Sequence, residues 1–256
     1  MRDRQVYIGI DPTAGRRPSH IAVLDAELRL LQQAAVPMRE IVALVDRYPA
    51  AICAVDAPKG VNRGLLTRPE VRTRVGLPAG GSKWSQYKLS EFELQRRGIK
   101  LYNTPLDPTA APGWMQAGWK LYDELRAIGY QDYHPEAVAD RQVCEVHPHA
   151  SFAVLLGTVP FKKTTLEGRL QRQLLLFEEN IGVPDAMEVF EEITRHHLLR
   201  GQLELEALLS HDALDAIIAA LTAHYAGTNT DNITLVGDRE EGYIVVPTST
   251  LKERYS

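Results

Sequence analysis

The stretch SHDALDAIIAAL, residues 210–221, predicts a buried helix with two acidic residues close to its start. Ser210 is a suitable N-cap, because a serine hydroxyl accepts a hydrogen bond from a free amide of the first turn. Asp212 and Asp215 are three residues apart, so they share one face of the helix, with about 5–6 Å between their Cβ atoms. Acids near a helix start gain about 0.3–1 kcal/mol each from the helix dipole, yet two neighbouring carboxylates repel. The pair is therefore either a helix-start preference or part of a site.

The composition is that of a folded protein. The chain has 256 residues, of which 45% are hydrophobic and 24% are charged, enough for a sizeable core. No apolar run approaches the roughly 18 residues of a membrane span, and MRDRQVYIGID lacks the apolar region of a secretory signal. Cys53 and Cys144 lie in apolar, strand-like runs, which favours buried reduced thiols. We therefore expect a cytoplasmic protein with no membrane partner.

Charge is distributed unevenly along the chain. Residues 59–100 hold ten Lys or Arg and three Glu, a net charge of +7 within a chain of net charge −4. A basic block in an acidic chain is a candidate surface for nucleic-acid phosphates. A solvated insertion explains the block equally well, and the sequence leaves both interpretations open.

The order of the expected elements indicates an α/β fold with a mixed sheet. Three apolar runs with short links predict an antiparallel meander, followed by a helix with apolar residues at helical spacing and then a buried strand. These elements are 6–11, 20–25, 28–36, 37–48 and 50–58. Residues 59–141, rich in Pro and Gly and holding every Trp, are interpreted as an insertion of helices and loops in a single domain that spans residues 1–256.

The rest of the chain predicts one further strand, several helices and a final hairpin. The strand is QVCEVHP, and the helices precede the one that starts after Ser210. The expected ranges are 142–148 for the strand, 150–157, 165–182 and 185–198 for the helices, and 232–238 with 242–247 for the hairpin.

Two more aspartates stand at the ends of predicted strands. Asp11 ends VYIGID and Asp56 follows AAICAV, and each is followed by proline within two residues. Each alone is typical of a turn, but sites of α/β proteins gather at the carboxyl ends of strands. Together with Asp212 and Asp215 they form a set of four carboxylates that need cations to be stable together. Oxygen ligands of this kind suit Mg²⁺ or Mn²⁺, and two such ions promote phosphodiester hydrolysis.

Several motifs carry a resemblance to a known family. In chain order they are GIDP, AVDAPKG, CEVHPHASF, KKTTLEGRLQR, HDALDAIIAA and EEGYIVVP. The chain resembles family 429 among the domains of unknown function, which is regarded as a group of ribonuclease-H-like nucleases. Its acids also resemble those of the RuvC-type branch of that superfamily. This branch has one acid on the first strand, one after the fourth strand and two on the last helix.

The resemblance implies a ribonuclease-H-like fold and a metal-dependent nuclease. It assigns Asp11, Asp56, Asp212 and Asp215 as ligands of two Mg²⁺ or Mn²⁺ ions, with Asp56 standing where RuvC-type resolvases have glutamate. Glu145 belongs to the pattern of family 429 and is either a further catalytic acid or a polar strand residue paired with an arginine. Resolvases of this type act as dimers, which makes a homodimer possible here.

Basic and aromatic residues supply further candidates for substrate binding. Phosphate contacts are expected from the basic block and from the helix near residue 165, although a solvated helix face is an equally good interpretation of the latter. Trp84 and Tyr87 either stack on unpaired bases or form a small core within the insertion. The candidate phosphate contacts are Lys59, Arg63, Lys162, Lys163, Arg169 and Arg172.

Three histidines lie close to the candidate acids. His147 and His149 have a spacing seen in zinc sites, but no third ligand is evident, so packing roles are favoured. His211 precedes Asp212 and is interpreted as a helix-start residue, with orientation of a water or phosphate as the alternative.

Two other classes of function compete with the nuclease. An ATP-dependent phosphotransferase is possible because such enzymes share this sheet, and DPTAGRRPS after the first strand holds one glycine and two arginines that could bind phosphate. A non-catalytic binding module is the other alternative. The repelling acid pair on the helix argues against it, because a protein without a site has little reason to keep the pair.

Overall fold

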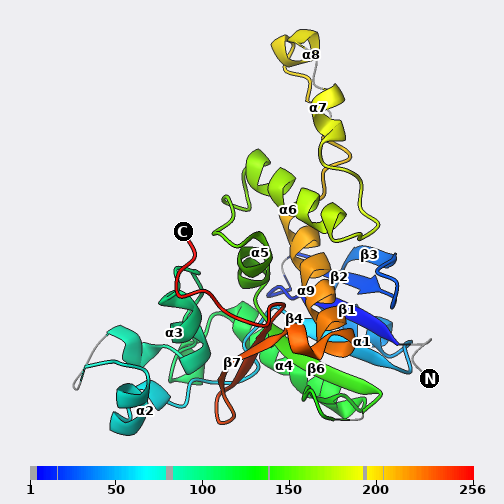
Figure 1. The fold of residues 1–256 in the computed structure, drawn as a ribbon. Helices are drawn as coiled ribbons and strands as arrows, with labels where there is room; N and C mark the ends of the chain where they lie inside the picture. Colours follow the sequence, from blue (N-terminus) through cyan, green and yellow to red (C-terminus); the bar gives the residue numbers. More distant parts are fainter. Residues whose placement is uncertain (1–4, 16, 79–82, 138, 193–194, 204) are drawn as a thin grey trace.

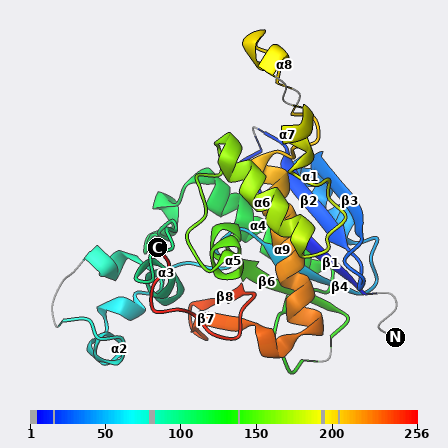
Figure 2. The same cartoon turned by 45° about the horizontal axis from the view of Figure 1, so that its top comes forward.

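The protein is built on a central twisted sheet with helices on both faces (Figures 1 and 2). The computed structural model describes residues 5–15, 17–78, 83–137, 139–192, 195–203 and 205–256. The strand order is β3-β2-β1-β4-β6-β8-β7, and β5 pairs with β6 outside this path. The strands are β1 (Val6–Asp11), β2 (Ser19–Leu24), β3 (Leu30–Val36), β4 (Ala51–Val55), β5 (Gln131–Asp132), β6 (Arg141–Val146), β7 (Thr234–Asp238) and β8 (Gly242–Val246).

Helices connect and cover these strands. The helices are α1 (Met38–Val45), α2 (Pro69–Arg74), α3 (Leu89–Gln95), α4 (Gly113–Ala127), α5 (Pro148–Leu156), α6 (Leu166–Glu178), α7 (Glu188–Glu192), α8 (Arg195–Leu199) and α9 (His211–Thr228). Short 3₁₀ turns cover Leu65–Thr67, Lys83–Gln86, Pro108–Ala110 and Thr230–Asn232. No helix in the described part of the chain is long and apolar enough to cross a membrane.

The sheet confirms the predicted fold class. Strands β1, β2 and β3 form the antiparallel meander, and β4 and β6 continue the sheet in parallel with β1. Strand β8 is also parallel to β6, and β7 closes the edge as the expected hairpin partner. Three antiparallel strands followed by parallel ones, flanked by helices, are the arrangement of a ribonuclease-H-like fold.

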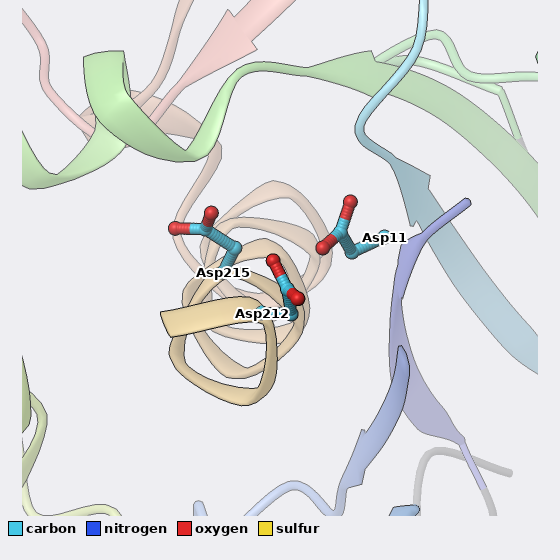
Figure 3. A group of neighbouring side chains, drawn as sticks. All are labelled: Asp11, Asp212 and Asp215. Atoms are coloured by element: carbon cyan, nitrogen blue, oxygen red, sulfur yellow. The ribbon is translucent and has the colours of Figure 1, made fainter. Parts of the chain in front are cut away.

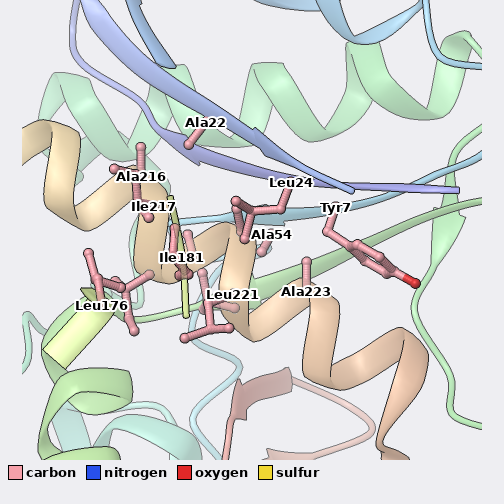
Figure 4. Close-up of a cluster of buried hydrophobic side chains, with 14 of the residues drawn as sticks. Tyr7, Ala22, Leu24, Ala54, Leu176, Ile181, Ala216, Ile217, Leu221 and Ala223 are labelled. Carbon is pink, nitrogen blue, oxygen red and sulfur yellow. The ribbon is translucent and has the colours of Figure 1, made fainter. Parts of the chain in front are cut away.

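The two faces of the sheet have separate hydrophobic cores. Because side chains alternate along a strand, Val6, Ile8 and Ile10 of β1 pack with α1 and α4. Tyr7 points the other way, into the core formed with α5, α6 and α9 (Figure 4). Asp11 is four residues after Tyr7 in β1 and points to the same side, so its carboxylate lies on the face of the sheet that α9 covers.

Gly9 allows α9 to lie directly on β1. A Cβ atom at Gly9 would lie 1.9 Å from the carbonyl oxygen of Ala216 and 2.4 Å from the amide nitrogen of Ala220. Only the absence of a side chain permits this approach. The contact fixes the distance between the end of β1 and the first turns of α9, where the candidate acids lie.

The segment predicted as an insertion forms two different structures. Its first part, through α2 and α3, makes a small core of Leu65, Leu66, Val71, Leu89 and Phe92. Its last long helix, α4, packs on the main sheet through Leu121 and Leu125. The region therefore supplies one helix, α4, to the layer that α1 also forms on this face of the sheet, as well as a peripheral unit.

The structure differs from the predicted elements over residues 185–198 and at Pro37, and it has the additional short strand β5. The helix expected over residues 185–198 begins only at Glu188, and its described residues form α7 and α8, which project from the body of the molecule (Figures 1 and 2). Residues 193 and 194 of that expected helix lie outside the described residues. Pro37, expected as the first helical residue, is the N-cap of α1, with an extended ψ of 138°.

Candidate functional site

Three of the predicted acids meet where β1 ends and α9 begins. One carboxylate oxygen from each of Asp11, Asp212 and Asp215 lies within 4.8 Å of the other two (Figure 3). Asp11 comes from the last position of β1, and the other two come from the first two turns of α9. The hydroxyl oxygen of Ser210 caps that helix by accepting a hydrogen bond from the amide of Ala213 at 3.2 Å. The predicted i, i+3 pair thus faces the strand-end acid.

The electrostatics of this group are unfavourable without a cation. Burial, followed by the charges of Asp56 and Asp215, raises the pKa of Asp11 from its ordinary 3.8 to about 9, against the lowering effect of Lys163. Burial also raises the pKa of Asp215, an effect that the neighbouring Lys163 opposes. A helix-start preference alone does not account for an acid whose side chain is 3% exposed.

Asp56 lies next to the three clustered aspartates but is not one of them. It follows the last residue of β4, and its side chain is 16% exposed. Its Oδ1 atom is 3.5 Å from Nδ1 of His147, and it is buried without a hydrogen-bond partner among the described residues. A buried carboxylate oxygen without a hydrogen-bond partner destabilises the fold, so this atom is available for a ligand or an ion.

Lys163 supplies a positive charge to the cluster. Its Nζ contacts Oδ2 of Asp215. Burial lowers the pKa of Lys163, but the charges of Asp215, Asp56 and Asp11 outweigh burial and raise it. The lysine precedes α6, so the loop between α5 and α6 contributes to the site.

The donor set fits a divalent metal ion such as Mg²⁺ or Mn²⁺. All three clustered groups are carboxylates, the ligands that hard cations prefer. Two oxygens bound to one Mg²⁺ lie up to about 4.2 Å apart, so movements of less than about 1 Å bring the clustered oxygens into coordination. A cation would relieve the repulsion that raises the pKa of Asp11, in competition with Lys163 for Asp215.

Two adjoining cavities open onto the acids. The first has a volume of about 500 Å³ and is lined by Asp11, Asp56, Asp212 and Lys163, together with residues of the β1–β2 hairpin. The second, of about 520 Å³, shares Asp56, His147 and Lys163 with the first and reaches Asp215. The carboxylates therefore lie along a cleft that is large enough for part of a polymeric substrate.

Glu145 lies apart from the three clustered acids. It has the strand parity of Val143, which packs on the α4 side of the sheet. Its Oε2 accepts hydrogen bonds from the amide of Lys59 at 2.8 Å and from Nζ of Lys88 at 3.1 Å. Both side chains of the Lys88–Glu145 pair are fully buried. The expected arginine partner is thus a lysine, and the pair links the peripheral unit to β6.

Most predicted phosphate contacts are engaged within the fold. Lys59 pairs with Asp132 at 3.1 Å. The side chain of Arg169 donates to the carbonyl oxygens of Leu208 and Leu209, which fixes the chain just before α9. Arg172 donates to the carbonyl oxygens of Phe161 and Gly168 and is 1% exposed.

The other two candidates differ in their position. Arg63 uses its backbone amide to bind Glu241 at 2.9 Å and lies outside both cavities. Lys162 is exposed and lines the second cavity. Lys162 and Lys163, more than the basic block, bring positive charge to the acids.

The basic block is largely neutralised by its own surroundings. Arg68 and Arg74 pair with Glu240 and Asp238, and Lys88 is buried with Glu145. Trp84 packs against Phe92 and Tyr87, with ring centroids 5.2 and 5.4 Å apart. These aromatic rings pack in the small core of the peripheral unit. Lys100, the last lysine of the basic block, does line the second cavity.

The histidines surround the acids without forming a zinc cluster among the described residues. Nδ1 of His211 is 2.7 Å from Oδ1 of Asp212. His147 contacts Asp56, and its Nε2 lies 3.3 Å from the carbonyl oxygen of Lys100. His149 lines the second cavity, and burial lowers its pKa to about 4.

Some residues around the site were not found in the sequence. His20 pairs with Asp11 across β1 and β2. Tyr102 and Trp114 line the first cavity, and Phe161 lines the second. None of these residues has a local motif. For His20 alone the sequence held a signal: the register of the short β1–β2 hairpin is enough to place it opposite Asp11. Arg17, which also lines the first cavity, is one of the two arginines already noted in DPTAGRRPS.

The β1–β2 hairpin does not form an open phosphate cradle in its described residues. The amide of Thr13 donates to the hydroxyl of Ser19 at 3.0 Å, and the amide of Gly15 donates to the hydroxyl of Thr13 at 3.3 Å. Arg16, one of the two arginines considered for ATP phosphates, lies outside the described residues. The hairpin thus gives the phosphotransferase alternative no specific support.

A family model covers most of the chain, including every acid described above. The model, described as "Protein of unknown function (DUF429)", matches residues 9–241. No curated protein and no solved structure matches the chain. The resemblance drawn from the six sequence motifs is confirmed: the chain belongs to the DUF429 family.

Proposed function

We propose that this protein is a metal-dependent nuclease that hydrolyses phosphodiester bonds in nucleic acids. The observation that carries the proposal is the convergence of Asp11, Asp212 and Asp215 within 4.8 Å at the cleft. A divalent cation held there would activate water and offset the charge that develops on the phosphate. Fold analogy alone does not establish an activity, so the proposal depends on this donor set.

Each group around the cleft has a role in this proposal. Asp11, Asp212 and Asp215 hold the metal, and Asp56, whose Oδ1 lacks a hydrogen-bond partner among the described residues, completes the site for a second ion. Lys163 and Arg17, which line the same cavity, contact phosphate oxygens of the substrate. With a cation bound to Asp215, Lys163 would be free to contact the substrate phosphate instead.

The site favours a nucleic acid over a small phosphate ester. The cleft continues past the acids into the second cavity, where Lys100 and Lys162 add positive charge. Cations on both sides of a cleavage site suit a backbone with several phosphates. DNA and RNA satisfy this requirement equally, and the experiment tests both.

Calorimetric titration with Mn²⁺ is the first test. We expect saturable binding to the wild type and at least about a hundredfold weaker binding to the double variant Asp212→Asn, Asp215→Asn, because two ligands are lost. Asp231→Asn is the matched control, since Asp231 is exposed beyond the far end of α9. Equal Mn²⁺ binding by all three proteins would contradict the metal site.

Cleavage assays then test the activity. Labelled single-stranded and double-stranded DNA and RNA are incubated with Mg²⁺ or Mn²⁺, with EDTA as the control. We expect cleavage that EDTA and Asp11→Asn both abolish. Metal binding with release of phosphate from ATP, and no cleaved nucleic acid, would instead favour the phosphotransferase.

A further inference from the structure

The second cavity differs in character from the first. Besides the residues that it shares with the acidic site, it has an apolar wall of Pro148, Val159 and Pro160. The ring of Phe161 completes this wall, and Phe161 is 58% exposed. Scattered exposed apolar side chains are common, so the ring has to be judged with its surroundings.

The backbone of Phe161 is held on both sides. Its amide donates to Oε1 of Gln171 at 2.8 Å, and its carbonyl oxygen accepts from Nη1 of Arg172 at 2.7 Å. Both partners belong to α6, so the loop position is tied to a regular element. The exposed ring is therefore presented to the cavity from a fixed backbone, which lowers the entropy cost of binding a ligand against it.

Positive charge surrounds this aromatic wall. Lys100, Lys162 and Lys163 line the cavity, together with Arg172. Arg172 is 1% exposed, and its Nε is buried without a hydrogen-bond partner among the described residues. Two acids also line this cavity, and both belong to the acidic site. Asp56 lines the first cavity as well, and Asp215 is one of the three clustered carboxylates. An anionic ligand with a flat apolar face matches this combination.

His149 adds a polar group to the lining of the same cavity. Burial, followed by the charges of His147, Arg172 and Lys163, lowers its pKa to about 4, so the imidazole is neutral at neutral pH. A neutral imidazole offers one hydrogen-bond donor and one acceptor. Those are the groups that recognise the edge of a nucleobase, whereas a charged ring would only attract phosphate.

We infer that this cavity binds one unpaired nucleotide of the substrate, with its base against Phe161 and its phosphate between Lys100 and Lys162. The inference rests on the proposed nuclease function and narrows its substrate class. A base inside a duplex is stacked on its neighbours, so only an unpaired base exposes a face to an aromatic side chain. The protein therefore acts on single strands or at unpaired nucleotides, with the cleaved bond next to this base.

Binding without metal tests the inference separately from cleavage. Fluorescence anisotropy in EDTA compares a labelled single strand with the matching duplex, for the wild type, Phe161→Ala and Phe161→Trp. Phe177→Ala is the matched control, since Phe177 is 40% exposed on α6 and lines neither cavity. We expect Phe161→Ala to bind the single strand about tenfold more weakly, within the range measured for base stacking, while Phe161→Trp and Phe177→Ala retain wild-type affinity.

The outcomes separate the inference from the proposed function. If Phe161→Ala loses affinity for the single strand and the wild type shows no metal-dependent cleavage, the nucleotide subsite is supported and the proposed nuclease function is contradicted. Metal-dependent cleavage by the wild type, with unchanged single-strand affinity in Phe161→Ala, supports the nuclease and overturns the subsite. Equal loss of single-strand and duplex affinity in Phe161→Ala also overturns it, and so does a wild type that binds neither strand form.

Discussion

The parity of a residue along its strand decides which acids enter the site. Asp11 shares its parity with Tyr7, and Asp56 shares its parity with Ile52, both in the core under α9. Glu145 has the parity of Val143 on the opposite face. The motif CEVHP made Glu145 a candidate catalytic acid, although alternation from the buried neighbours in β6 already argued for the other side of the sheet.

Replacement of Glu145 tests its structural role. Glu145→Gln removes the carboxylate that pairs with the fully buried ammonium group of Lys88 and leaves it only the nearby Glu91, whose own pKa burial raises to about 7. We expect a loss of about 3–5 kcal/mol in the free energy of unfolding, measured by chemical denaturation. Glu240→Gln is the control, because its partner Arg68 is 38% exposed and exposed pairs contribute about 0–1 kcal/mol.

A second measurement separates this role from metal binding. The folded Glu145→Gln protein is expected to bind Mn²⁺ with wild-type affinity, because Glu145 lies outside the three clustered carboxylates. Weaker Mn²⁺ binding with unchanged stability would instead make Glu145 a ligand.

Single residues of the site were only partly predictable. The four aspartates stood out because each ends a strand or begins a helix. Lys163, which binds Asp215, looked no different from Lys162 in the sequence. Only the path of the loop before α6 distinguishes them, and that path depends on tertiary contacts such as the hydrogen bond between Phe161 and Gln171.

The contact between α9 and β1 sets the geometry of the site at the scale of elements. Gly9 is two residues before Asp11, and Ala216 follows Asp215 directly. The backbone approach at Gly9 therefore determines how closely Asp11 meets the acids of α9.

A methyl group at Gly9 is expected to separate these elements. Gly9→Ala places Cβ against the backbone of Ala216 and Ala220, which cannot move aside as a side chain can. We expect a destabilisation of about 3 kcal/mol, at the upper end of the cost of overpacking, and weaker Mn²⁺ binding by the protein that still folds. Chemical denaturation and calorimetry measure the two effects.

Gly60→Ala serves as the control for this substitution. A Cβ atom at Gly60 would meet no atom within 4 Å, so we expect a change within about 0.5 kcal/mol. Similar stabilities for Gly9→Ala and Gly60→Ala would show that the helix contact tolerates a side chain.

Elements with strong periodicity were predicted well, and elements defined by distant partners were not. The meander, β4, β6 and the helix after Ser210 follow from apolar patterns that their own residues carry. Strand β5 has two exposed residues and exists because it pairs with β6. Similarly, α4 is placed by its contact with the sheet, which the Pro- and Gly-rich composition around it obscured.

The stability of the whole molecule should depend on pH and metal together. Asp11 has a pKa of about 9 in the folded chain, against an ordinary 3.8. Because the folded state holds this proton more tightly than the unfolded state, metal-free stability is highest below about pH 4 for this group and falls as the pH rises towards about 9. A bound cation replaces the proton and removes this loss.

Thermal unfolding with and without Mg²⁺ measures this dependence. We expect the increase in Tm caused by Mg²⁺ to be larger at about pH 8 than at about pH 6, because metal and proton compete for the same carboxylates. The double variant Asp212→Asn, Asp215→Asn should show little increase at either pH. An increase that is independent of pH, or that persists in the double variant, would place the stabilising ion elsewhere.

The two halves of the site are 201 positions apart in the chain, since Asp11 and Asp212 come from β1 and α9. At translation rates of about 5–20 residues per second, roughly 10–40 s separate their synthesis. During that interval the backbone of β1 at Gly9 has no helix packed against it, and a nascent chain carries Asp11 without the two acids that complete the cluster. Under the proposed nuclease function, a ribosome-bound chain is therefore expected to cleave no nucleic acid until α9 emerges.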